Sequence, residues 1–290
     1  MDPMVAMYIA QVIHGLAYGM LLFLVSSGLT LVFGMMSILN LAHASFYMFG
    51  AYLGYTVLKF TGNFWATLTV APLIAAFFGC LSERCLLRKV HAQGHVAELI
   101  LTLGISMLIL ESVKIFWGTE SLIVNVPHLL KGLVNLGGLP YPLYRLFVIG
   151  LSLVVFVILF LLLYKTRLGM IVRAAVADAD MVSALGVNVP LVFLLVFGLG
   201  TWLAGLAGVV AAPLLSVYPG MADQMALDAF IVVIVGGLGS LWGAFIVSIC
   251  LGELSALGIQ FIPRMAPVLM FAFMALVLAF KPKGFFGERE

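Results

Sequence analysis

Charge is scarce in this chain. Only 9% of its 290 residues are Asp, Glu, Lys or Arg, while 64% are hydrophobic, and a soluble domain carries about a quarter charged residues. This composition excludes a water-soluble surface. A membrane helix needs about 20 mostly apolar residues, and such runs recur along the sequence. The composition therefore predicts an integral membrane protein with several spans.

The usual marks of catalytic and metal sites are also missing. The three cysteines, Cys80, Cys85 and Cys250, lie in apolar runs, and their spacing fits neither a disulfide framework nor a zinc site. No HExxH, GxSxG or clustered His, Asp and Glu set is present, and the five histidines are dispersed. We expect no catalytic residue and no metal ligand. An intramembrane enzyme stays an alternative that would require polar residues converging on one cavity.

A phosphate-binding GxxxxGK[ST] loop is absent as well, so the chain cannot bind and hydrolyse ATP by that route. Any coupling to ATP must come from a partner. The sequence has no nucleic-acid footprint, because a membrane protein uses its basic residues to set its orientation. Residues 1–7 contain Asp2 and no Lys or Arg, which is unlike the start of a cleavable signal peptide.

What the chain does contain is a series of apolar spans, which cover residues 8–33, 41–60, 64–87, 97–117, 145–164, 191–215, 228–252 and 265–281. Nine of the fourteen Lys and Arg fall within 84–89, 165–173 and 281–289. By the positive-inside rule these three places, and with them the C-terminus, are cytoplasmic. The polar connection 118–144 is then expected outside the cell.

Two uncharged breaks interrupt the apolar sequence. One runs from Gly34 to Asn40, and the other contains Gly236 to Ser240. The parity of crossings requires the stretch 226–262 to begin and end outside, as a re-entrant hairpin or as two short crossings. Interrupted segments in both halves of a transporter indicate the substrate path, although the glycines could instead serve tight helix packing. We predict one all-α transmembrane domain over 1–290, with discontinuous helices and about 8 to 10 membrane segments.

Five charged residues lie in or near the spans, and intramembrane charge suggests function. Asp228 and Glu253 could relay protons if they faced one cavity, so a proton-coupled secondary transporter of a small polar or zwitterionic solute is the alternative function. Against it, Glu98 can begin its helix, and Glu111 and Lys114 stand three apart, where they can neutralise each other.

The stretch 168–189 is polar for this protein, and we expect it to form a short cytoplasmic helix. Val176, Met181 and Leu185 recur at helical spacing, and Gly186 suits a helix end. Such a helix has an apolar face to bury on headgroups or on a partner protein. Charges of both signs make an anionic membrane surface the less suitable partner: Arg173, Asp178 and Asp180.

Short segments in a specific order and spacing carry a resemblance over almost the whole chain. They are Gly15–Gly19, Gly28–Gly34, Asn40–His43 with Gly50–Tyr52, Arg173–Ala175, Ala184–Val187, Gly205–Gly208, Gly236–Ser240 with Gly243–Ala244, and Lys281–Gly287. With these segments the chain resembles the LivH-type permease of branched-chain amino-acid ABC importers. Two positions depart from the family pattern: Lys281 stands where Arg is usual, and Ala44 stands where Gly is expected.

The resemblance implies an importer in the inner membrane with several other subunits. These are a second, LivM-like permease, two cytoplasmic ATPase subunits that carry ATP and Mg²⁺, and a periplasmic or extracellular substrate-binding protein. This chain would itself bind no cofactor. Branched-chain amino acids are the expected substrate, and other amino acids, amides, urea and aromatic acids stay open because the binding protein largely selects the solute.

The resemblance also assigns two sets of residues. The helix at 168–187 would be a coupling helix that fits a groove on an ATPase, through Arg173, Ala174, Asp178, Ala184, Leu185 and Gly186. The breaks at 34–45 and 236–243 would line the path between the two permeases, through Asn40, His43, Ser45, Gly236, Gly237, Gly239 and Ser240.

Overall fold

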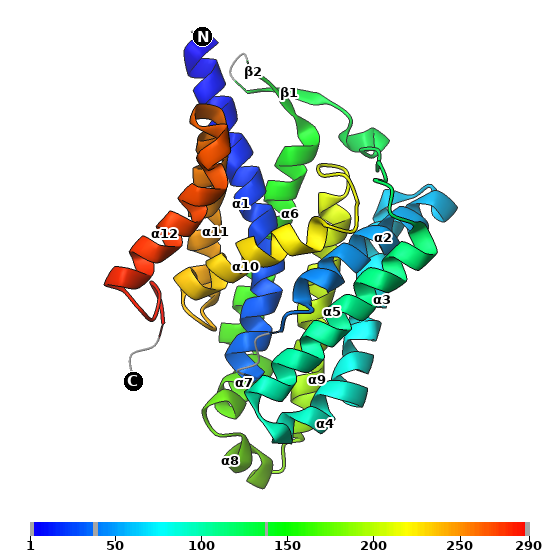
Figure 1. Ribbon diagram of the computed structural model, residues 1–290, viewed down its shortest axis with the longest axis vertical. Helices are drawn as coiled ribbons and strands as arrows, with labels where there is room; N and C mark the ends of the chain where they lie inside the picture. The colour runs from blue at the N-terminus through cyan, green and yellow to red at the C-terminus, as the bar shows by residue number, and fades with distance from the viewer. Residues whose placement is uncertain (1–2, 37–39, 137–138, 288–290) are drawn as a thin grey trace.

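A computed structural model describes residues 3–36, 40–136 and 139–287, and helices account for most of them (Figure 1). The helices are α1 (Pro3–Met36), α2 (His43–Thr61), α3 (Phe64–Ser82), α4 (Arg88–Val90), α5 (His95–Trp117), α6 (Leu143–Lys165), α7 (Arg167–Ala177), α8 (Ala179–Ala184), α9 (Val189–Ala211), α10 (Met221–Gly236), α11 (Leu241–Phe261) and α12 (Ala266–Phe280). Short turns complete them: η1 (Glu83–Leu87), η2 (His91–Gln93), η3 (His128–Leu130) and η4 (Pro263–Met265).

Seven helical segments in the described part of the chain are long and apolar enough to cross a membrane. They are Met7–Met36, Phe64–Val90, His95–Trp117, Leu143–Lys165, Val189–Ala211, Leu241–Phe261 and Pro263–Phe280. The helices α2 and α10, which adjoin the two breaks, are not among them. Together with these two interrupted helices, the seven confirm a polytopic helical bundle of the predicted size. Helices suit this setting because all their backbone hydrogen bonds are internal.

The centre of the bundle is α1, which packs against α11, α9, α6 and α10. Small residues make these contacts close. A Cβ atom placed on Gly28 would lie 2.6 Å from the carbonyl oxygen of Gly200 in α9, so a larger side chain at this crossing would push α1 and α9 apart. Close backbone approach through small residues is the usual means of helix association in membranes.

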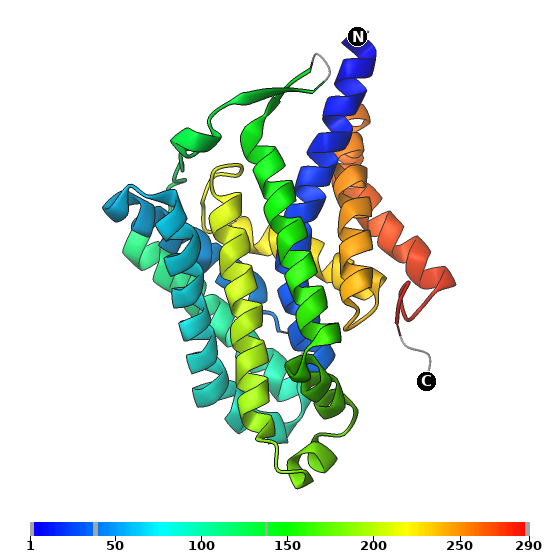
Figure 2. The same ribbon diagram turned by 180° about the vertical axis from the view of Figure 1, so that it is seen from behind.

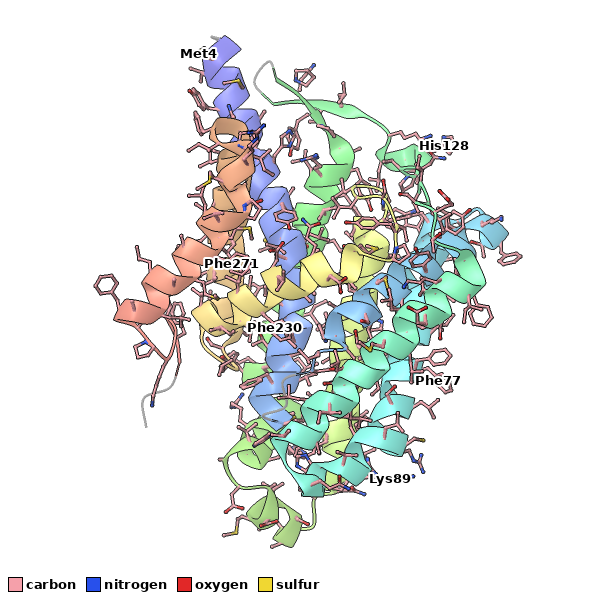
Figure 3. The ribbon with its side chains drawn as sticks, in the orientation of Figure 1. Met4, Phe77, Lys89, His128, Phe230 and Phe271 are labelled. Atoms are coloured by element: carbon pink, nitrogen blue, oxygen red, sulfur yellow. The ribbon has the colours of Figure 1, made fainter. Side chains whose placement is uncertain are left out.

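The two ends of the molecule differ. At the upper end in Figure 1 lie the start of α1 and an antiparallel hairpin of β1 (Leu133–Leu136) and β2 (Leu139–Pro142), in which Leu133 pairs with Pro142. At the lower end lie α4, α7 and α8, and the basic clusters at 84–89 and 165–173 are therefore together. In Figure 3 the labelled Lys89 and His128 mark these opposite ends.

The polar connection 118–142 is fixed to the loop between α9 and α10. Leu122 and Val217 exchange backbone hydrogen bonds of 2.8 and 3.0 Å. The loop before α10 therefore lies at the same end as the hairpin and opposite to α7 and α8, as the parity of crossings predicted. Figure 2 shows α6 and α9 running side by side between the two ends.

The apolar span 228–252 is interrupted at the predicted break, because its residues belong to two helices. The helix α10 ends at Gly236 and α11 begins at Leu241. In Figure 1, α10 runs across the bundle and α11 returns along α1 towards the upper end. Gly237 with φ of 99° and Gly239 with φ of 82° make the turn, in a backbone region that favours glycine. This arrangement matches the re-entrant form that parity allowed.

Candidate functional site

The first break is held by two polar residues at the start of α2. Residues 37–39 lie outside the described part of the chain. The Asn40 side chain accepts a hydrogen bond of 3.0 Å from the Ala42 backbone N–H. His43 is 2% exposed, and its Nε2 donates to the carbonyl of Val25 in α1 at 3.0 Å. Asn40 thus fixes the backbone just before α2, and His43 ties the start of α2 to α1.

Further contacts tie this break to α5. The Ser45 and Ser106 hydroxyls are 2.8 Å apart, and the Leu41 N–H donates to the Thr102 hydroxyl at 3.4 Å. Asn40 Nδ2 and His43 Nδ1 have no hydrogen-bond partner among the described residues. The predicted path residues of the first break are therefore buried inside this chain, where they also bind three helices together.

The second break is capped by its own residues. The Ser240 hydroxyl accepts a hydrogen bond of 3.1 Å from the Gly243 N–H and so begins α11, and the Ser240 N–H donates to the Gly237 carbonyl at 3.0 Å. Gly236 and Gly237 are buried, whereas Gly239 is exposed. The second break therefore reaches the surface of the chain at Gly239.

Sequence reasoning missed what covers the end of α10. The Phe285 N–H donates to the Val235 carbonyl at 2.8 Å, and the Phe286 N–H donates to the Gly236 carbonyl at 3.1 Å. The segment after α12 therefore supplies donors for carbonyls that the end of a helix leaves unpaired. The sequence indicated only positive charge and a family motif at 281–287. The one further sequence feature that indicated a turn here was Gly284, whose φ of 79° is a conformation that favours glycine.

The predicted coupling helix is two helices, not one. Asp178 has an extended backbone (φ −155°, ψ 97°), and its carboxylate accepts a hydrogen bond of 2.8 Å from the Met181 N–H. It ends α7 and caps α8, because a short acidic side chain at this position satisfies a free N–H of the next helix. Gly186, with φ of 84°, follows α8 as expected.

All six predicted coupling residues are exposed at the lower end: Arg173, Ala174, Asp178, Ala184, Leu185 and Gly186. The apolar side chains beside them are exposed too, with 63% for Met170, 59% for Met181 and 77% for Leu185. Arg173 donates to the Leu163 carbonyl, and its guanidinium lies 5.5 Å from the centre of the Tyr164 ring. The α7–α8 unit thus presents apolar and charged groups that no other part of the described chain covers.

A polar cluster beside α7–α8 connects residues 83–93, called here the 83–93 turn (η1, α4 and η2), to the start of α9. The buried Glu83 pairs with Arg88 at 3.2 Å, and Arg88 also donates to the Pro190 carbonyl at 2.9 Å. Glu98, near the start of α5 as predicted, lies 2.5 Å from His91 and is 1% exposed. A cavity of about 140 Å³ lies here, lined by Met36, Glu83, Leu87, Arg88, His91, Val189, Pro190 and Phe193.

The other four charged residues in or near the spans make different kinds of contact. Lys114 pairs with Glu111 at 2.7 Å, which confirms their mutual neutralisation. Asp228 accepts a hydrogen bond of 2.7 Å from the Tyr18 hydroxyl, and Glu253 lies against Gly15. Within the described ranges, no three His, Cys, Asp or Glu side chains form a group that could hold a metal.

Comparison with known proteins decides the family. Residues 11–278 match the family described as the branched-chain amino acid transport system permease component. The chain belongs to this family. As a member of this permease family it is a transport subunit and not an enzyme. No solved structure matches it significantly.

Relatives of this permease cover nearly its full length. BraD of Pseudomonas aeruginosa, a high-affinity branched-chain amino acid transport permease, is 28% identical over 99% of this chain and 98% of its own. LivH of Escherichia coli K12 is 28% identical over 98% of this chain and 96% of its own. A LivH protein of Methanocaldococcus jannaschii is 28% identical over 80% and 76%. These matches confirm the LivH-type resemblance.

Proposed function

We propose that this permease is the membrane subunit of an ATP-driven importer that carries branched-chain amino acids across the inner membrane. Similarity to LivH and BraD over nearly the whole chain supports this function. The observation that carries the ATP-driven part is the exposed α7–α8 unit, whose apolar Met181 and Leu185 lack a covering partner in the chain. A contiguous exposed apolar patch with a polar rim is typical of a protein interface.

The orientation follows from the basic residues. The lower end, with the clusters at 84–89 and 165–173, faces the cytoplasm by the positive-inside rule. Lys281 and Lys283 follow α12, and by the same rule these basic residues support a cytoplasmic C-terminus. The upper end, with the β1–β2 hairpin and the loop before α10, then faces the substrate-binding protein.

Coupling proceeds through the contacts of α7. This helix packs against α1, α6 and α9, and α8 packs against α9. ATPase subunits that bind the α7–α8 unit and move on ATP binding would therefore displace α1 and α9, which form the centre of the bundle. The helix α1 ends at Met36, within the first break, so the displacement reaches the proposed path.

The path itself is formed at the two breaks, where backbone groups replace continuous helix. Asn40, His43 and Ser45 hold the first break, and Gly236 to Ser240 form the second. A second, LivM-like permease would complete the wall beside Gly239, which is exposed in this chain. ATP and Mg²⁺ would be bound by the ATPase subunits, and no cofactor is assigned to this permease.

Affinity purification of the tagged permease in mild detergent, with mass identification of bound proteins, tests the proposal. We expect a second permease and ATPase subunits to co-purify, and the assembly reconstituted with its binding protein to take up leucine only with ATP. A permease recovered alone, with full uptake after reconstitution and no ATP, would contradict the proposal and favour proton-coupled transport.

A further inference from the structure

Asp228 is a buried carboxyl group without a cationic partner. It lies in the middle of α10 and is 8% exposed, and in the described part of the chain no Lys, Arg or His forms an ion pair with it. Its one hydrogen bond, of 2.7 Å, comes from the neutral Tyr18 hydroxyl. A carboxylate within a membrane is expensive unless it is paired, so a ligand cation would complete this site.

Two more tyrosines lie on segments next to the Tyr18–Asp228 pair. Tyr47 is in α2, which packs against α10, and Tyr218 is in the loop that leads into α10. The Tyr47 side chain is fully buried, and its hydroxyl has no hydrogen-bond partner among the described residues. Buried hydroxyls are nearly always hydrogen-bonded. The Tyr47 hydroxyl is therefore available to a polar ligand.

The position of the cluster suits a solute entering from the upper end. Tyr218 follows Val217, whose backbone pairs with Leu122 in the connection at that end. Asp228 precedes Gly236 by two turns of α10, or about 12 Å along the helix. An incoming solute would therefore meet the cluster before it reaches the second break.

The chemistry of the cluster selects one kind of group. A carboxylate attracts a cation through its charge, and phenol oxygens can accept hydrogen bonds from an ammonium group. The same carboxylate repels an anion, and it can accept hydrogen bonds from a neutral amide but gains no attraction between opposite charges from it. We propose that Asp228, together with Tyr18, Tyr47 and Tyr218, binds the ammonium group of the transported solute.

This inference rests on the proposed function and narrows its substrate. Amides, urea and aromatic acids, the other solutes that the resemblance left open, carry no ammonium group. Amino acids carry one whatever their side chain. The Asp228 cluster therefore favours amino acids, because it would bind the ammonium group that all of them share.

A purely structural role is the competing explanation, because the Tyr18–Asp228 bond also joins α1 to α10. The variant Asp228→Asn distinguishes a structural role from ammonium binding. Its amide oxygen can still accept a hydrogen bond from Tyr18, whereas its negative charge is gone. Asp223→Asn is the matched control, because Asp223 is on the same helix and exposed. Tyr47→Phe is a second probe, since it removes a hydroxyl that makes no hydrogen bond in this chain.

The test is ATP-dependent leucine uptake by the complete importer in proteoliposomes, with ATPase activity and folded yield measured in parallel. We expect Asp228→Asn to reduce uptake about tenfold or more, as the loss of a charge-assisted contact does, with a normal folded yield. Asp223→Asn should match the wild type. Uptake by Asp228→Asn within about twofold of the wild type would overturn the inference.

Two further outcomes are also decisive. If Asp228→Asn does not fold, Tyr47→Phe decides: reduced uptake at normal yield supports the site, and unchanged uptake overturns it. If the wild type takes up no leucine with ATP, the proposed function has failed, and ligand stabilisation of the purified permease tests the site separately. Isopentylamine should then raise the unfolding temperature of the wild type but not of Asp228→Asn, and 4-methylpentanoate should raise neither; equal effects on both proteins would overturn the site.

Discussion

Gly34 and Gly239 hold the two helix breaks directly against each other. A Cβ atom on Gly34 would lie 2.7 Å from the Cα of Gly239, and a Cβ on Gly239 would lie 3.0 Å from the Cα of Gly34. At these distances there is no room for a side chain on either residue. The breaks, about 200 residues apart in sequence, therefore form one structural unit, so that a shift of either one displaces the other.

Replacing Gly34 with Val should reduce transport. The added side chain must push the second break away, and overpacking of this kind costs about 1–3 kcal/mol. We expect ATP-dependent uptake to fall more than the yield of folded protein. Gly104→Val in α5 is the control, because a Cβ there meets nothing within 4 Å. Equal loss of uptake and folded protein would instead indicate that the glycine serves packing alone.

Much of this fold was predictable because long apolar runs have few alternatives in a membrane. Both breaks were found because Gly34 to Asn40 and Gly236 to Ser240 interrupt apolar sequence without adding charge. The contact between them was not predictable, because no local pattern records which distant segments meet. The same holds for Tyr18 and Asp228, which are 210 residues apart.

The end of α7 shows a different limit of sequence reasoning. Asp178 was interpreted as a charge on one helix, whereas its side chain caps the next helix. Both uses suit an Asp in polar sequence, and the choice depends on the backbone angles that the neighbouring packing imposes. The tail at 285–286 was likewise missed because its role as a donor to α10 lies in its backbone, which every residue shares.

Replacing Leu185 with Asp should impair binding of the ATPase subunits. Leu185 is 77% exposed and beside Met181, so the change removes apolar contact area without disturbing the packing of this chain. We expect normal folded yield and a several-fold loss of co-purified ATPase; truncating a central interface residue often costs about 2 kcal/mol or more. Leu133→Asp, exposed at the opposite end, is the control. Undiminished ATPase recovery with Leu185→Asp would argue against the α7–α8 surface as the docking site.

The Asp178 cap can be tested by a pair of substitutions. Asp178→Ala removes the bond to the Met181 N–H and should destabilise α8 by about 0.5–2 kcal/mol, whereas Asp178→Asn keeps an acceptor. We expect faster amide hydrogen exchange at 179–184 only in the Ala variant, together with weaker coupling of ATP hydrolysis to uptake. If the Asn variant loses coupling as well, the charge of Asp178, and not its cap, is what the ATPase requires.

The ion pair of Arg88 and Glu83 should stabilise the junction between the 83–93 turn and α9. Glu83 is 2% exposed, and Arg88→Met would leave its carboxylate without a partner while also removing the bond to the Pro190 carbonyl. An unsatisfied buried group costs about 1–3 kcal/mol, so the unfolding temperature in detergent should fall. Arg84→Met, in the same basic cluster and without an ion pair to Glu83, should change it little.

The double variant Glu83→Gln with Arg88→Met should recover part of the loss, because it removes the buried charge together with its partner. A double variant less stable than Arg88→Met alone would mean that Glu83 is stabilised by contacts other than Arg88.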